Sequence, residues 1–305
     1  ATSYAETQTA IPLQTATALA ESGFRQRIQN NEEFFSVAWS PDGEYIAGGT
    51  TNGVSLWRIS DGSTLGELGG YIYRPATYVQ WTLDGREVFT ATESGWGVYR
   101  WNVESGQELE SWQGPACTRA VNPCVNDRIP GTDTFISLYT YKNNAGSNEA
   151  YALIYPFANA KKNSDGRGEP SSSFFLAEGR SFTAVAVSPD AKIVATGDST
   201  GRVGIWNLAD GTPIKTLRGD DDNAAYALAW SADGKTLAGY SGRKIWFWDV
   251  AGERLVKTIE MEGQDYQDWQ VIRWRPNSNQ MAVINSGKVY LYNTESGEFL
   301  RDIST

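Results

Sequence analysis

The chain has 305 residues and no His, and its 26 Lys and Arg against 36 Asp and Glu give a formal net charge of −10. Nucleic acids and anionic membranes bind clustered basic residues, and the sequence has no such cluster, which argues against both as partners. No long apolar run predicts a transmembrane helix. The lack of His excludes Ser-His-Asp and Cys-His nucleophiles and His-ligated zinc, so we expect no enzyme activity, cofactor or metal site.

Residues 1–33 are polar and weakly patterned, and they precede the first clear repeat, which begins at Phe34. In that repeat, F-F-S-V-A-W is followed by an S-P-D-G turn, and three further strand-like runs follow at Tyr45–Ala47, Val54–Trp57 and Leu65–Leu68. Alternating apolar runs between Gly-containing turns are typical of short antiparallel strands. The repeat therefore predicts four strands.

The second repeat keeps this order, whereas the third, at about 114–178, is irregular. Its four strands are predicted at Ala116–Val121, Thr134–Tyr141, Ala150–Tyr155 and Phe174–Ala177. It also contains a loop with both cysteines and two insertions, at 142–149 and 159–173. The second insertion is low in apolar residues, which predicts a mobile segment.

Repeats four to six return to the regular pattern, and their spacing predicts the architecture. Asp190 and Asp233 occupy matching turns 43 residues apart, and Trp206 and Trp248 end matching strands 42 residues apart. A period of about 40–45 residues with four strands per unit is typical of a β-propeller. We expect an all-β propeller domain over residues 34–305.

The number of blades is open between six and seven. Six repeats are recognisable, and residues 1–33 are either an N-terminal arm or an abbreviated seventh blade with strands near Leu13–Ala18 and Phe24–Gln29. Seven is the favoured prediction, with six as the alternative.

The repeats resemble the tryptophan–aspartate (WD) repeat family. The resemblance rests on the strand ends Trp101-Asn102, Trp206-Asn207 and Trp248-Asp249, together with the S-P-D-G turns. The family's Gly-His element is absent throughout, and Arg218-Gly219-Asp220 stands at one such place. The family also has a buried aspartate in the hairpin between the second and third strands, and in this sequence at most Asp198 matches it. The His–Asp–Ser/Thr–Trp hydrogen-bond network implied by the resemblance is therefore incomplete.

The two cysteines, Cys117 and Cys124, are separated by six residues that include Pro123, and they are compatible with a small disulfide. Disulfides persist in oxidising compartments, and the chain starts at Ala1 without a signal sequence, as a processed exported chain would. We expect a disulfide and an extracytoplasmic location, with two free thiols as the alternative.

Consecutive aspartates in D-D-D-N at 220–223 raise the question of a calcium site. Calcium loops space their ligands over alternate positions and add a distal carboxylate, which this run does not. We therefore expect a solvated turn and no calcium.

Loops that join one blade to the next carry the candidate binding residues. Tyr, Trp and Arg are the side chains that most often anchor protein interfaces. The candidates are Glu33, Tyr73, Arg74, Arg180, Asp221, Tyr266 and Trp269.

The leading hypothesis is a non-catalytic scaffold that docks a protein partner or assembles with further copies or subunits. An enzyme or small-ligand binder that uses the central channel is the alternative, and a domain of a larger signalling protein is a third. Because one fold supports many functions, the first choice rests partly on the resemblance.

Overall fold

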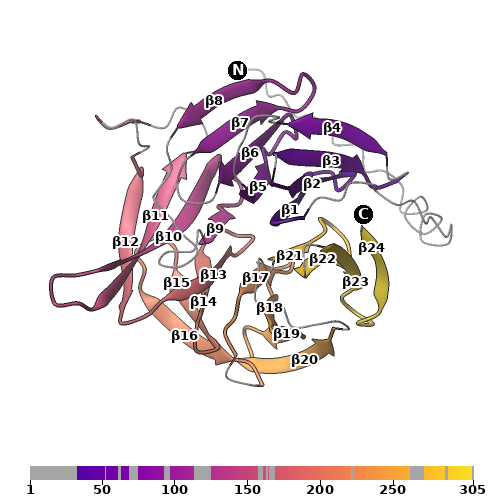
Figure 1. The fold of residues 1–305 in the computed structure, drawn as a ribbon. Coiled ribbons are helices and arrows are strands. Elements are labelled where there is room, and N and C mark those ends of the chain that lie inside the picture. Colours follow the sequence, from indigo (N-terminus) through magenta and orange to yellow (C-terminus); the bar gives the residue numbers. More distant parts are fainter. Residues whose placement is uncertain are drawn as a thin grey trace, which may run out of the picture.

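The computed structural model describes residues 33–51, 53–60, 63–68, 75–92, 97–112, 125–156, 161–162, 164, 169–220, 223–261, 271–285 and 288–303. These residues form six four-stranded antiparallel sheets arranged around one axis, and no helix occurs among them (Figure 1). The predicted all-β propeller is confirmed.

Each sheet is one blade, and its strands follow one another in chain order from the axis outward (Figure 1). Blades 1 to 3 consist of β1 (Ser36–Trp39), β2 (Tyr45–Gly49), β3 (Val54–Arg58), β4 (Thr64–Leu68); β5 (Ala76–Trp81), β6 (Glu87–Thr92), β7 (Val98–Asn102), β8 (Glu108–Trp112); and β9 (Val125–Arg128), β10 (Thr134–Lys142), β11 (Asn148–Pro156), β12 (Ser172–Glu178). Blades 4 to 6 consist of β13 (Phe182–Val187), β14 (Ile193–Asp198), β15 (Arg202–Asn207), β16 (Pro213–Arg218); β17 (Ala227–Trp230), β18 (Thr236–Ser241), β19 (Lys244–Asp249), β20 (Arg254–Glu260); and β21 (Val271–Trp274), β22 (Gln280–Asn285), β23 (Lys288–Asn293), β24 (Phe299–Ile303).

Burial decreases from the axis to the rim of each blade. In blade 5, β17 is buried throughout, and β18 and β19 are buried except at their ends. The outermost strand β20 is mostly exposed or half-buried and buries only Ile259. The inner strands therefore read as nearly continuous apolar runs because both of their faces pack against neighbouring blades.

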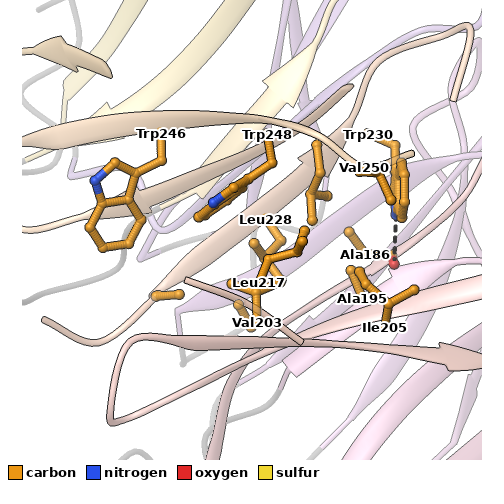
Figure 2. Close-up of a cluster of buried hydrophobic side chains, with 13 residues drawn as sticks. Ala186, Ala195, Val203, Ile205, Leu217, Leu228, Trp230, Trp246, Trp248 and Val250 are labelled. Atoms are coloured by element: carbon orange, nitrogen blue, oxygen red, sulfur yellow. Dashed lines mark hydrogen bonds between the residues drawn. The ribbon is translucent and has the colours of Figure 1, made fainter. Parts of the chain in front are cut away.

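The core is divided into layers that lie between successive blades. Figure 2 shows the layer between blades 4 and 5, where Val203, Ile205 and Leu217 meet Leu228 and Trp248. Equivalent clusters lie between the blades of each of the five remaining neighbouring pairs. Each blade therefore buries both faces, one against each neighbour.

The ring closes with six blades. Phe34, Trp39 and Trp57 of blade 1 pack directly against Ile284 and Leu291 of blade 6. Because all six neighbouring pairs are in contact, no place is left between blades for a seventh. The six-blade alternative is confirmed and the favoured count of seven was wrong, since the number of blades depends on packing between repeats. Of residues 1–33, to which the seventh blade was assigned, all but Glu33 lie outside the described residues.

A tryptophan hydrogen bond joins the innermost strands at three of the six seams. The last residue of β17, Trp230, donates its indole N–H to the carbonyl of Ala186 in the preceding blade at 3.1 Å, as Figure 2 shows. Trp81 and Trp274 make the same bond to the preceding blade, at 3.2 and 3.1 Å. The repeated tryptophan therefore connects blades as well as filling space between them.

The three remaining seams use charged groups instead. Arg128 Nη1 donates to the Trp81 carbonyl at 3.2 Å, and the Val187 amide donates to Asp127 Oδ2 at 2.7 Å. At the seam that closes the ring, Arg275 Nη2 donates to the Gly43 carbonyl at 3.2 Å, and the guanidinium lies 5.2 Å from the centre of the Trp39 ring. Every seam thus has a polar connection near the axis.

Blade 3 corrects one predicted element. Its innermost strand is Val125–Arg128, not Ala116–Val121, and residues 113–124 lie outside the described residues. V-N-D-R has one apolar residue, so no alternating pattern marks it as a strand. Its polar side chains supply the connections to both neighbouring blades. The predicted insertion at 142–149 includes the last residue of β10, the first two residues of β11 and the five residues that connect them. The two nine-residue strands form a longer hairpin than in the other blades (Figure 1).

Three tryptophans at matching third-strand positions, Trp101, Trp206 and Trp248, find their hydrogen-bond acceptors in two ways. In blades 2 and 4, Trp101 and Trp206 donate to the hydroxyls of Thr90 and Thr196, at 3.1 and 2.8 Å. In blade 5, Gly239 stands at the threonine position because a Cβ there would lie 2.6 Å from the Trp248 ring. The Trp248 indole donates instead to the Arg218 carbonyl at 2.7 Å.

Replacing Thr196 with Val should lower the free energy of unfolding by about 1–3 kcal/mol, because the buried indole N–H of Trp206 loses its acceptor while the side-chain volume is retained. Urea unfolding followed by tryptophan fluorescence measures the change. Thr196→Ser keeps the hydroxyl and is the control, with a smaller loss expected. Equal losses in both variants would show that the hydrogen bond contributes nothing.

Candidate partner-binding face

Antiparallel pairing places all loops of one kind on one side of the ring. The segments between an outermost strand and the next innermost strand lie on the same side as the hairpin turns between second and third strands. We call this side the loop face; Glu33, Arg180, Asp198 and Asp220 belong to it. The opposite side, with the turns between first and second strands, is the turn face.

The turn face is built from self-contained polar turns. In blade 4, Ser188 Oγ donates to Asp190 Oδ1 at 2.6 Å, and the Lys192 amide donates to the same oxygen at 3.2 Å. The hydrogen bond from Ser188 is the main reason that the pKa of Asp190 is lowered. Asp84 and Asp233 make the same contacts in blades 2 and 5. These aspartates therefore have a structural role.

On the loop face, Asp198 and Arg180 form a partly buried pair. Asp198 is 3% exposed, and its Oδ1 accepts hydrogen bonds from the Thr200 amide, the Thr200 hydroxyl and the Arg202 amide, at 2.8, 2.7 and 3.1 Å. Its other oxygen lies 3.6 Å from Arg180 Nη1. Arg180 thus lies just before the innermost strand, where the WD-repeat pattern has its histidine.

Blade 5 has a different arrangement of polar groups on the loop face. Asp220 Oδ1 accepts the indole N–H of Trp246 at 2.7 Å, and both its oxygens lie 3.1 Å from Lys244 Nζ. Gly219 is required beside it because a Cβ would lie 2.4 Å from the Trp246 ring. Asp220 was noted in the aspartate run and at a Gly-His place of the repeat, but no hydrogen bond to Trp246 was predicted, so this role was missed. The position of Arg218-Gly219-Asp220 in the repeat was the available signal.

The predicted binding residues fall into two groups. Glu33 is exposed at the start of blade 1, and Arg180 is half-buried beside Asp198, so the structure does not bring the two together. The other candidates and the two cysteines lie outside the described residues. They are Tyr73, Arg74, Asp221, Tyr266, Trp269, Cys117 and Cys124.

Neither a metal cluster nor a membrane-spanning helix is found among the described residues. No group of three or more His, Cys, Asp or Glu side chains is arranged there to hold a metal ion. No helix in this part of the chain is long and apolar enough to cross a membrane. Asp221 and Asp222 are not described, so the expected absence of calcium stays a prediction.

Comparison with known proteins agrees with the blade geometry. Residues 26–58, 171–207 and 211–249 match the family model "WD domain, G-beta repeat", and the last two matches cover strands of blades 4 and 5. The chain is a WD-repeat β-propeller.

Three curated relatives share parts of the WD-repeat region. The chain is 25% identical to WD repeat-containing protein 1 of Xenopus tropicalis over 76% of its own length and 36% of that protein. It is 36% identical to pre-rRNA-processing protein IPI3 of Mycosarcoma maydis over 22% of the chain and 12% of that protein. It is 32% identical to the intraflagellar transport protein 122 homolog of Danio rerio over 36% of the chain and 9% of that protein. The chain thus spans about a third or less of the relatives it matches.

Replacing Asp198 with Ala should cost about 1–3 kcal/mol of unfolding free energy, because two backbone amides and a hydroxyl lose their acceptor. Arg180→Gln should cost less than about 1 kcal/mol, since the pair is partly solvated and Asp198 keeps its other donors. Chemical denaturation of both variants measures the difference. A larger loss from Arg180→Gln than from Asp198→Ala would contradict this assignment.

Proposed function

We propose that this WD-repeat propeller is a non-catalytic scaffold that binds a protein partner, or further subunits, through its loop face. The observation that carries the proposal is the contrast between the two faces. The aspartates of the turn face are engaged in local turns, whereas the connections from blade to blade on the loop face range from three residues after β12 to twelve after β8. Variable loops on a rigid scaffold are where binding specificity is usually found.

The relatives support the same class of function. Their names describe proteins of rRNA processing and intraflagellar transport as well as a WD-repeat protein. These processes differ, and what they share with this chain is the repeat. A common scaffold with different partners accounts for that better than a common reaction does.

Charge changes on the loop face should reduce partner binding, while matched changes on the turn face should not. The test pair is Glu33→Lys with Glu178→Lys on the loop face, against Glu44→Lys with Glu104→Lys on the turn face; all four side chains are exposed. Both pairs add the same charge. The tagged full chain is used to capture partners from its native source, with quantitative mass spectrometry.

We expect at least one partner whose capture saturates. The loop-face pair should reduce capture of that partner at least ten-fold, and the turn-face pair should leave it unchanged. Equal capture by both pairs, or a native mass that shows only monomer with no enriched partner, would contradict the proposal. Circular dichroism of each variant confirms that the fold is retained.

We further propose an oxidising, extracytoplasmic location, supported by the spacing of Cys117 and Cys124. Both thiols should resist alkylation in the unfolded chain until a reductant is added, because they are joined to each other. Peptide mass mapping with and without reduction measures this. Labelling of both cysteines in the non-reduced chain isolated from its source would contradict the proposal.

A further inference from the structure

The next-to-last residues of the six innermost strands form one layer around the axis. They are Ala38, Gln80, Asp127, Ala186, Ala229 and Arg273. Each pairs with a buried apolar residue of the second strand in its own blade, such as Ile136 opposite Asp127 and Ala282 opposite Arg273. The common register places the six residues at one level of the ring.

Half of this layer is alanine, and the alanines have a clear structural role. The carbonyl of each accepts the tryptophan indole of the next blade. Because this bond uses the main-chain oxygen, it requires no polar side chain at this level. Gln80, Asp127 and Arg273 instead place polar side chains larger than alanine there, and all three residues are half-buried.

Asp127 and Arg273 lie on innermost strands on opposite sides of the axis. They belong to blades 3 and 6, which are separated by two blades on either side, and β9 and β21 are among the innermost strands (Figure 1). Asp127 Oδ2 accepts the Val187 amide at 2.7 Å, and Arg273 Nη1 donates to the Ile272 carbonyl at 2.9 Å. Within the described residues, no ion pair joins the carboxylate to the guanidinium. Each charge thus keeps hydrogen-bonding capacity that its contacts do not use.

Tyr78 contributes a third polar group to this region. Its ring packs against Phe135 with centroids 6.3 Å apart, and its hydroxyl is buried without a hydrogen-bond partner. Burial and then the charge of Asp127 raise the pKa of Tyr78, while Arg273 lowers it. Burial raises the pKa of Asp127, and Arg273 is the strongest influence in the opposite direction. The three groups therefore act on one another's charge.

A buried hydroxyl without a partner costs free energy. Such groups are found where a ligand or a bound water completes the hydrogen bonds. A simple anion would be repelled by Asp127, and a simple cation by Arg273. A ligand with opposite charges at its two ends complements both groups.

We propose that the central channel binds a small zwitterion whose carboxylate contacts Arg273 and Tyr78 and whose ammonium contacts Asp127. The site uses no residue of the loop face, so it is independent of the proposed scaffold function. β-Propellers surround a central channel, and the side chains that line it decide what can enter.

The probes are unbranched ω-amino acids of increasing chain length, titrated into the full chain by isothermal calorimetry at neutral pH. Alkyl carboxylates and alkylammonium ions of matched length are the single-charge controls. We expect one chain length to bind saturably and at least ten-fold more tightly than either control. No preference for any zwitterion over both controls would overturn the proposal, because ordered water would then suffice at these groups.

Variants separate the site from the fold. Arg273→Gln should weaken binding at least ten-fold, whereas Arg254→Gln, which removes the same charge on the outermost strand β20, should leave it unchanged. Tyr78→Phe removes only the unpartnered hydroxyl, so it should weaken binding several-fold without lowering the melting temperature. Binding that survives Arg273→Gln, or is lost equally in Arg254→Gln, would overturn the assignment.

Discussion

The packing of each blade between two neighbours is the constraint on which the rest of the structure depends. A four-stranded sheet has two apolar faces here, and only a closed ring covers both faces of every sheet. The layer between blades 4 and 5 alone holds 13 buried residues (Figure 2). Each large apolar side chain contributes about 1.5–3 kcal/mol on burial, against about 1 kcal/mol for a neutral hydrogen bond. Packing therefore holds the ring together, and the polar connections near the axis fix how the blades meet.

Other side chains make the polar contacts of the missing histidine in several blades. Arg180 takes the place beside Asp198 in blade 4, and Asp220 reaches Trp246 in blade 5. Where threonine is available, the third-strand tryptophan uses its hydroxyl. The indole of Trp57 in blade 1 is buried with no partner, so this blade relies on its contacts with Phe34 and the neighbouring sheet. The His–Asp–Ser/Thr–Trp hydrogen-bond network of the WD repeat is thus replaced by different contacts in different blades.

The period of the S-P-D-G turns and strand-ending aromatic residues was enough to predict all four strands of blades 1, 4, 5 and 6 and the inner three strands of blade 2. It failed at Val125–Arg128, since N-D-R acts through hydrogen bonds to other blades and leaves no alternating pattern. The blade count failed for a related reason, because contact between Trp39 and Arg275 joins residues 236 positions apart in the sequence. Arg180 was selected for its residue type, and its pairing with Asp198 also depends on the folded blade. The layer with Asp127 and Arg273 becomes visible only when the six innermost strands are placed in register.

Blades 1 and 6 hold the first and the last strands of the ring, so the chain does not run directly from one to the other and closure depends on side-chain contacts at this seam. Hydrogen–deuterium exchange of the full chain under native conditions tests this closure most directly. Amides of β1 and β21 should be protected to the same extent as those of β13 and β17, which lie at a seam that the chain does connect. Exchange at β1 and β21 that is orders of magnitude faster than at β13 and β17 would show that the ring is open between blades 6 and 1.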